Sequence, residues 1–158
     1  LALGGGRPHY GALRPLPTRL RGTIPTMSTQ LPRVVHTPLQ LRYGDTDALG
    51  HVNNAVFASF AEVGRIAFVK EVGLPIANFI LARIAMDFRR QVYLLDEVTM
   101  TTAISHIGNS SITFTQLVYA NGEVAAEIEA VAVWFDFDTQ RPMRVPDEVR
   151  AFQYALAP

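Results

Sequence analysis

The chain has 158 residues, a length that suits one folded domain around one hydrophobic core. It contains no cysteine, which excludes disulfides, zinc sites built from thiolates and cysteine nucleophiles. Six of the 14 basic residues lie in 1–44, where there is no acidic residue, so 45–158 carries eight basic and 14 acidic residues. An acidic domain of this kind argues against nucleic-acid binding.

Residues 1–32 differ in composition from the rest of the chain. They are rich in Gly, Pro and Arg, and such a segment buries too little apolar surface to order itself. Met27 opens a plausible short lead-in, so 1–26 is interpreted as an upstream extension or as residues foreign to the native protein. No stretch has the apolar core of a secretory signal or the ~18 uncharged residues of a membrane span. We expect a disordered extension over 1–32, one domain over 33–158, and a cytoplasmic location without membrane contact.

The first expected elements are a strand and a long helix. Residues 34–43 are predicted to form a strand, and Pro38 favours an edge position for it. Residues 44–53 are predicted to form a loop. From 54 to 71, apolar residues recur at helical spacing in two adjacent stripes, until Gly73 ends the pattern. Because few charges interrupt these stripes, we expect a curved sheet to cover the helix on most sides.

After residue 79 the apolar period changes from helical spacing to alternation. The pattern predicts strands over 80–89, 96–106, 111–119 and 123–137. Asn121-Gly122 is a strong signal for a two-residue hairpin turn, and a short helix is expected within 146–156. Late strands with short connections favour an antiparallel meander. The sequence therefore predicts an α+β fold, an antiparallel sheet wrapped around one long helix.

A polar cluster lies where the first strand gives way to the helix. Its members are Asp45, Asp47, Gly50, His51, Asn53 and Asn54. A helix start offers unpaired N–H groups and a partial positive charge, and a neighbouring carboxylate offers a base or a nucleophile. The cluster therefore predicts chemistry on a carbonyl group. The N–H groups would polarise the oxygen while the carboxylate, or a water that it activates, attacks the carbon.

Other interpretations of this cluster have different requirements. Asp45, Asp47 and Gly50 match part of an EF-hand loop, but Val56 occupies the position that needs a bidentate glutamate. An aspartyl phosphatase requires an α/β pattern that the chain lacks. A metal held by Asp45, Asp47 and His51 lacks a second group of ligands, so no metal is expected. An ordinary turn whose asparagines cap the helix stays open as an alternative.

A family resemblance rests on the stretch 47–54 and on Phe57, Phe60, Glu62 and Arg65. Together they resemble the signature of the hotdog-fold acyl-CoA thioesterases, and more narrowly the 4-hydroxybenzoyl-CoA thioesterase-like branch. Further matching segments bring the resemblance to roughly 33–155: they are 87–98, 108–111 and 141–147.

The resemblance implies a fold and an assembly as well as an activity. The fold is a five-stranded antiparallel sheet around one long helix. Subunits form homodimers by joining sheets edge to edge, with the active site between them, and often pair again into homotetramers. Acyl-CoA is the implied substrate, and no separate cofactor is implied because coenzyme A is part of that substrate.

The resemblance also implies roles for individual residues. The family's catalytic aspartate falls on Asp47, and the backbone N–H that holds the thioester oxygen falls on Asn54. His51 either positions water or the nucleophile, or forms hydrogen bonds within the loop or across the dimer interface. Glu62 is the second candidate for the catalytic carboxylate. If it is not catalytic, we expect it to pair with Arg65 or with a partner strand.

Further residues are candidates for binding the substrate. Gly50 and Asn53 belong to the loop that holds the implied catalytic groups. Arg89 and Arg90 are candidates for binding the phosphates of coenzyme A, because guanidinium groups match the geometry of phosphate oxygens. The alternative is that both side chains are simply solvated at the end of a strand. Ser110 is a candidate contact for the pantetheine arm. His106, by contrast, is interpreted as a core or interface histidine.

The sequence thus predicts hydrolysis of a small or medium acyl- or aroyl-CoA to free acid and coenzyme A. Two alternatives stay open. The first is a hydratase or dehydratase of acyl thioesters, for which His51 would be indispensable. The second is a non-catalytic acyl-CoA-binding module. The sequence does not separate direct attack by Asp47 from activation of water, and it does not identify the acyl group.

Overall fold

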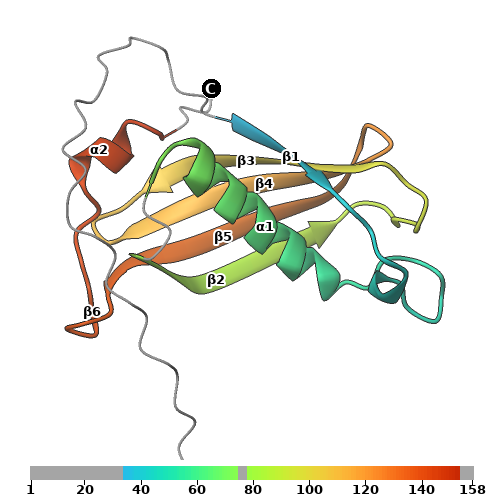
Figure 1. Cartoon of the computed structure of the whole chain (residues 1–158), viewed down its shortest axis with the longest axis horizontal. Helices are drawn as coiled ribbons and strands as arrows, with labels where there is room; N and C mark the ends of the chain where they lie inside the picture. The colour runs from blue at the N-terminus through green and yellow to red at the C-terminus, as the bar shows by residue number, and fades with distance from the viewer. Residues whose placement is uncertain (1–33, 75–77, 154–158) are drawn as a thin grey trace, which may run out of the picture.

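The computed structural model describes residues 34–74 and 78–153. In this part of the chain, one long helix crosses the concave face of a curved antiparallel sheet (Figure 1), which confirms the expected α+β architecture. The helix is α1, Val56–Glu71. The strands are β1 (Val34–Leu39), β2 (Phe79–Phe88), β3 (Val98–Ile107), β4 (Ser111–Ala120), β5 (Glu123–Asp136) and the short β6 (Arg141–Pro142). A 3₁₀ turn, η1 (Tyr43–Asp45), precedes α1, and α2 (Asp147–Arg150) follows the sheet.

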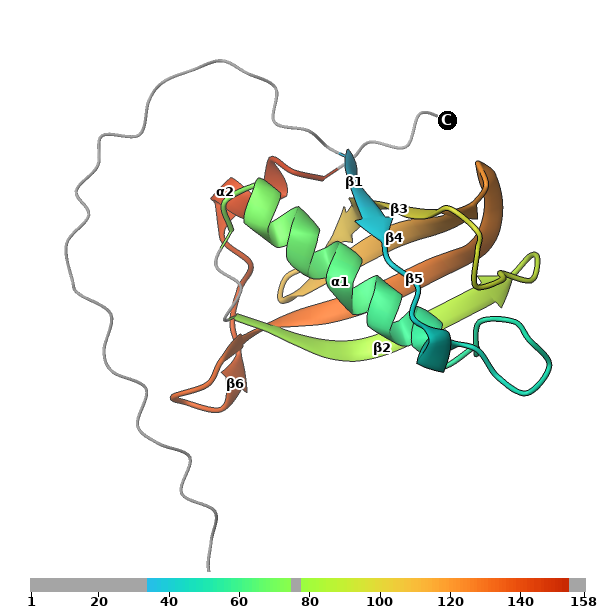
Figure 2. The ribbon, with the colours of Figure 1, turned by 45° about the vertical axis from the view of Figure 1, so that its right-hand side comes forward.

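The strand order is β1-β3-β4-β5-β2, and every neighbouring pair is antiparallel. β3, β4 and β5 form the expected meander, and the hairpin turn at Asn121-Gly122 has positive φ at both residues. The expectation that β2 continues this meander beside β3 is wrong. Because β1 and β4 occupy both edges of β3, β2 pairs with the open edge of β5. β1 and β2 are thus the two edges of the sheet (Figure 2).

The expected bounds of the four later strands differ from the structure by one or two residues, and three other elements also differ. The first strand ends at Leu39 instead of residue 43, because the chain turns into η1 and leaves Tyr43 exposed. The long helix begins two residues later than expected. The expected helix within 146–156 has only the four residues of α2, and its last positions lie outside the described residues. None of the described helices is long and apolar enough to cross a membrane.

The core consists of two apolar clusters that follow each other along α1. The first half of the helix packs Phe57 and Phe60 onto one cluster, and the second half packs Phe68 onto the other. A buried polar side chain, Gln116 of β4, lies between the two clusters. Its Nε2 donates to the carbonyl of Ala61 in α1, at 2.9 Å. The helix is therefore fixed to the sheet at its middle by a polar contact that sequence reasoning missed.

Part of the expected apolar burial is missing in the single chain. Val63 and Ile66 of α1 remain 46% and 44% exposed, so the expectation that a sheet covers most of the helix is wrong for one subunit. β2 has no fully buried residue, which contradicts its expected dry face. β2 is an edge strand, and its pairing with β5 shifts register between Leu81 and Arg83. Apolar side chains of α1 and β2 are left facing outward.

His106 is exposed on β3, so it is not a core histidine, and the alternative of an interface histidine stays a prediction. The residues before it alternate as expected, with Met100 and Ile104 buried. The pairing of β3 with β4 then shifts register between Ile104 and His106. A β-bulge of this kind reverses which side chains face the core, and Ile107 takes the buried position instead.

Candidate active site

The loop between η1 and α1 folds back on itself and carries most of the polar cluster. The Asp47 N–H donates to the His51 carbonyl at 2.9 Å, which closes the loop. Gly50 has φ of +84°, a left-handed conformation that favours glycine at this position. The Val52 N–H donates to the Val92 carbonyl at 2.7 Å, so the loop is tied to the connection between β2 and β3. Asp47 is therefore presented by an ordered turn.

The Asp47 carboxylate uses its two oxygens differently. Its Oδ1 accepts a hydrogen bond from the Leu49 N–H at 2.8 Å. The His51 Nδ1 lies 3.8 Å from the same oxygen, which is too far for a hydrogen bond. The side chains are 31% (Asp47) and 22% (His51) exposed. No hydrogen-bond donor among the described residues contacts Oδ2, so one oxygen is held while the other is available for chemistry.

The start of α1 has one backbone N–H without an acceptor. The Asn53 N–H donates to the Asp45 carbonyl, and the N–H groups of Ala55 and Val56 donate to the side chain and the carbonyl of Asn53. Asn53 therefore braces the turn, but the N-cap of α1 is Ala55, without a side-chain cap hydrogen bond, so the expectation that an asparagine caps the helix is wrong. In the described part of the chain, the Asn54 N–H has no such partner. Asn54 is an exposed residue at the positive end of the helix dipole.

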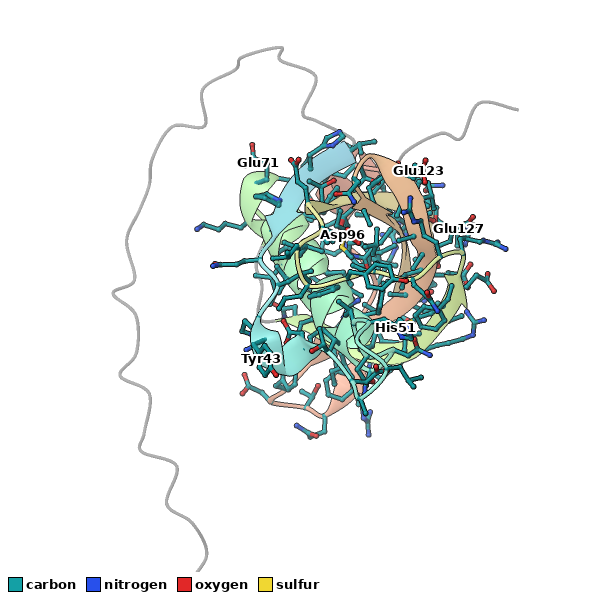
Figure 3. The ribbon with its side chains drawn as sticks, turned by 90° about the vertical axis from the view of Figure 1, so that its right-hand side faces the viewer. Tyr43, His51, Glu71, Asp96, Glu123 and Glu127 are labelled. Carbon is teal, nitrogen blue, oxygen red and sulfur yellow. The ribbon has the colours of Figure 1, made fainter. Side chains whose placement is uncertain are left out.

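A cavity of about 430 Å³ brings these groups together. It is lined by Asp47, Leu49, His51, Val52, Asn54, Phe57, Phe88, Arg89, Arg90 and Gln91. We call it the Asp47 cavity. Figure 3 faces the end of the molecule that carries it, and His51 is labelled there. Five candidates from the sequence thus line one cavity, from segments about 40 residues apart.

Residues 41–153 match the family model of the thioesterase-like superfamily. The chain belongs to this superfamily. A thioesterase from Thermus thermophilus, solved with coenzyme A and Zn, is 36% identical, with a TM-score of 0.69 over 74% of this chain and 89% of that one.

This thioesterase-like chain is also similar in fold to a structure of low sequence identity, and it is shorter than one of its curated relatives. The solved structure of a 4-hydroxybenzoyl CoA thioesterase mutant has a TM-score of 0.70 at 16% identity, over 78% of this chain and all of that one (100%), which confirms the hotdog fold. The chloroplastic acyl-acyl carrier protein thioesterase ATL3 of Arabidopsis thaliana is 28% identical over 72% of this chain. The chain spans 64% of the length of that relative.

Two of the arginines in this thioesterase-like site have acidic partners. Arg89 donates to Glu127 at 3.0 Å, and Arg90 pairs with Glu123. Both arginines still line the Asp47 cavity, but their charges are partly neutralised from β5, where Figure 3 labels both glutamates. Their contact with the phosphates of coenzyme A stays a prediction.

The structure does not bring every candidate to the Asp47 cavity of one chain. Gly50 and Asn53 shape its loop without lining it. Ser110 lies in the turn between β3 and β4, at the other end of the sheet from Phe88. Glu62 lines a second cavity further along α1, and it makes no ion pair with Arg65. Glu62 and Ser110 could therefore act at an Asp47 cavity in two ways. They could belong to a second subunit that contributes to the cavity, or they could contact a substrate that extends out of the cavity to reach them.

Asp45 is a structural brace of the loop. Its side chain is buried, with the residue 3% exposed, and it accepts hydrogen bonds from the Arg42 backbone N–H and guanidinium, both at 2.8 Å. The Arg42 side chain and backbone N–H hold the pKa of the Asp45 carboxyl below its usual value. Asp45 is thus engaged away from Asp47, and no three metal-ligating side chains cluster in the described ranges.

Replacing this brace with Asp45→Asn is expected to lower the free energy of unfolding by about 1–2 kcal/mol at neutral pH, because charge-assisted bonds to Arg42 are lost. The depressed pKa makes the wild-type contribution complete above the unfolded pKa of about 3.9, and the contribution is lost as the pH falls through the lower folded value. Urea titrations of both proteins at several pH values measure this. A difference between them that persists undiminished in strong acid would contradict the assignment.

Proposed function

We propose that this protein hydrolyses acyl-CoA thioesters to free acid and coenzyme A in the Asp47 cavity. One observation carries the proposal: the free Oδ2 of Asp47 and the free N–H of Asn54 belong to residues that line the same cavity. Membership of the thioesterase-like superfamily and the coenzyme A bound by the Thermus relative support the same substrate class.

The chemistry follows from how charge moves in thioester hydrolysis. The thioester oxygen accepts the Asn54 N–H, and attack at the carbon places negative charge on that oxygen. The N–H and the helix dipole stabilise this charge, and one such donor is typically worth ~3 kcal/mol. Asp47 Oδ2 either attacks the carbon to give a mixed anhydride, which water then hydrolyses, or takes the proton from an attacking water. The carbon–sulfur bond breaks and coenzyme A leaves as a thiolate, so no strong general acid is required.

The direct test is a panel of acyl- and aroyl-CoA thioesters assayed with a thiol reagent. The proposal predicts release of coenzyme A with at least one member of the panel. An enoyl-CoA that loses its conjugated absorbance without releasing a thiol would indicate a hydratase instead. Stabilisation of the protein by acyl-CoA without any turnover would indicate the non-catalytic binding module.

The assembly is part of the same proposal. β2 is an edge strand with Ile80 and Leu81 exposed, and Val63 and Ile66 face outward from α1. An exposed apolar edge of this kind invites pairing with another strand, and a second copy that joins along β2 would cover it. We propose a homodimer formed in this way. The further pairing into a homotetramer stays a prediction based on the family resemblance.

The double substitution Ile80→Lys with Leu81→Lys tests the dimer. Both side chains are exposed in one chain, so the charges cost the monomer little but oppose burial against a second β2. We expect the mass measured by light scattering to fall from that of a dimer or larger assembly to that of a monomer. Leu95→Lys is the matched control, because Leu95 is an apolar residue that is 95% exposed in the loop between β2 and β3, outside the edge strand itself. A monomeric wild type, or an unchanged mass for the double variant, would contradict the proposed interface.

A further inference from the structure

A second cavity lies between α1 and β2. It has a volume of about 220 Å³ and is lined by Glu62, Arg65, Ile66, Val69, Phe79, Leu81, Phe114 and Ala132. Six of these eight residues are apolar, so the cavity suits a hydrocarbon group. We call it the Arg65 cavity. Its two charged residues, Glu62 and Arg65, both come from α1.

Arg65 is a half-buried cation without a carboxylate partner among the residues that the structure describes. Three arginines are half-buried in the described part of the chain, namely Arg65, Arg90 and Arg150. Arg90 pairs with Glu123, and Arg150 Nε lies 3.5 Å from an oxygen of Asp147. All 14 acidic side chains of the sequence fall within the described ranges, and none places an oxygen within 4.0 Å of Arg65. A guanidinium that has lost part of its hydration is stabilised by an anionic partner.

Arg65 is held in place by the buried amide of Gln116. The Nε2 of Gln116 is committed to the Ala61 carbonyl at 2.9 Å and to Thr102 Oγ1 at 3.0 Å. Its Oε1 therefore faces Arg65 and accepts a bond from Nη1 at 3.3 Å. This is the one hydrogen bond that the described residues offer the Arg65 side chain, although a guanidinium carries five N–H donors. The remaining donors are available to an acceptor in the cavity.

Electrostatics point the same way. Burial lowers the pKa of Arg65, and the negative charge of Glu62 only partly opposes this effect. Glu62 itself is exposed, so water screens its charge more than that of the deeper arginine. An anion in the Arg65 cavity would thus gain more from Arg65 than it loses to Glu62.

We propose that the Arg65 cavity receives the far end of the acyl group and that Arg65 binds a carboxylate there, so that ω-carboxylated acyl-CoA thioesters are preferred over their methyl-ended counterparts. This inference rests on the proposed thioesterase function. The apolar walls contact the methylene chain, while the planar guanidinium forms paired hydrogen bonds to the carboxylate. From its first residue, Val56, to Arg65 the helix rises by about 13–14 Å, so a chain of several methylenes is needed to reach Arg65 from the thioester on the same subunit.

The kinetic test compares adipoyl-, suberoyl- and sebacoyl-CoA with hexanoyl-, octanoyl- and decanoyl-CoA. For at least one pair of equal length, wild type is expected to favour the carboxylated thioester by about tenfold or more in kcat/KM. Arg65→Met should reverse this preference, Arg65→Lys should retain part of it, and Glu62→Gln should increase it. Arg144→Met is the matched control, because Arg144 is an exposed arginine paired with Asp147 away from either cavity. A wild-type preference for methyl-ended chains, or an Arg65→Met variant that retains the wild-type ratio, would overturn the inference.

A binding measurement separates this inference from the proposed function. Suberate should raise the melting temperature of the wild-type protein more than octanoate does, and Arg65→Met should lose this difference. If no thioester releases coenzyme A but suberate still binds through Arg65, the proposed hydrolysis fails and the carboxylate site stands. If hydrolysis occurs but neither suberate nor any ω-carboxylated thioester is favoured, the carboxylate site fails and the hydrolysis stands. If Arg65→Met does not fold, the inference is still tested by Arg65→Lys and by the wild-type ratio of kcat/KM for carboxylated over methyl-ended thioesters.

Discussion

Asp47→Asn is expected to lower kcat/KM for acyl-CoA hydrolysis by a factor of about 10²–10⁴. Asparagine has nearly the shape of aspartate, and its side-chain oxygen still accepts the Leu49 N–H that holds the turn. It has no negative charge, however, so it neither attacks the thioester nor removes a proton from water. The loss is expected in kcat more than in KM, because the carboxylate acts on the reacting carbon and not on coenzyme A.

The matched control for this substitution is Asp136→Asn. Asp136 also accepts the N–H of the residue two positions later, Asp138, at 2.9 Å, but it is the last residue of β5 and lies outside the Asp47 cavity. The control should keep wild-type rates, and circular dichroism of both variants checks that each is folded. An Asp47→Asn protein that turns over as fast as the control would remove the assigned role of Asp47.

Gly64→Ala is expected to destabilise the fold by about 2–3 kcal/mol. A Cβ at this position in α1 would lie 2.6 Å from Gln116 Nε2 and 2.7 Å from Thr102 Oγ1, and it would also overlap the sulfur of Met100. Alanine in a helix interior otherwise gains ~1 kcal/mol over glycine, so the clash must exceed this gain. Glycine is required here because α1 approaches the sheet closely at the layer of Gln116.

Urea unfolding, followed by the fluorescence of the buried Trp134, measures this effect. Gly44→Ala is the matched control, because a Cβ at Gly44 would meet nothing within 4 Å. That variant should be as stable as wild type or more stable by up to ~1 kcal/mol. A Gly64→Ala protein that matches this control would show that α1 and the sheet have room between them, which contradicts the close packing at Gln116.

The overall fold could be predicted because its strongest signals are local. The apolar stripes of α1, the alternation along β4 and the turn at Asn121-Gly122 each depend on residues close together in sequence. The partner of β2 was mispredicted because strand pairing depends on which edges other strands have already occupied, and β1 occupies the edge of β3. Local patterns contain no information about that competition.

The candidate site was predictable in its residues more than in its geometry. Asp47, His51 and Asn54 stand together in sequence, so their meeting at one cavity was foreseeable. The free N–H of Asn54 was expected only through the resemblance, because which N–H groups stay unpaired depends on the backbone path around Asn53. Gln116 was missed because a glutamine between apolar strand residues gives no sign that α1 lies over it.

The most direct test of the account is the backbone amide of Asn54. Uniformly ¹⁵N-labelled Asp47→Asn protein should bind, without turning it over, the acyl-CoA that wild type hydrolyses fastest. At saturation we expect the Asn54 amide proton to move downfield by more than any other amide proton of residues 46–55, because it donates to the thioester oxygen. An Asn54 resonance that stays in place while the acyl-CoA is fully bound would contradict the proposed site of the thioester.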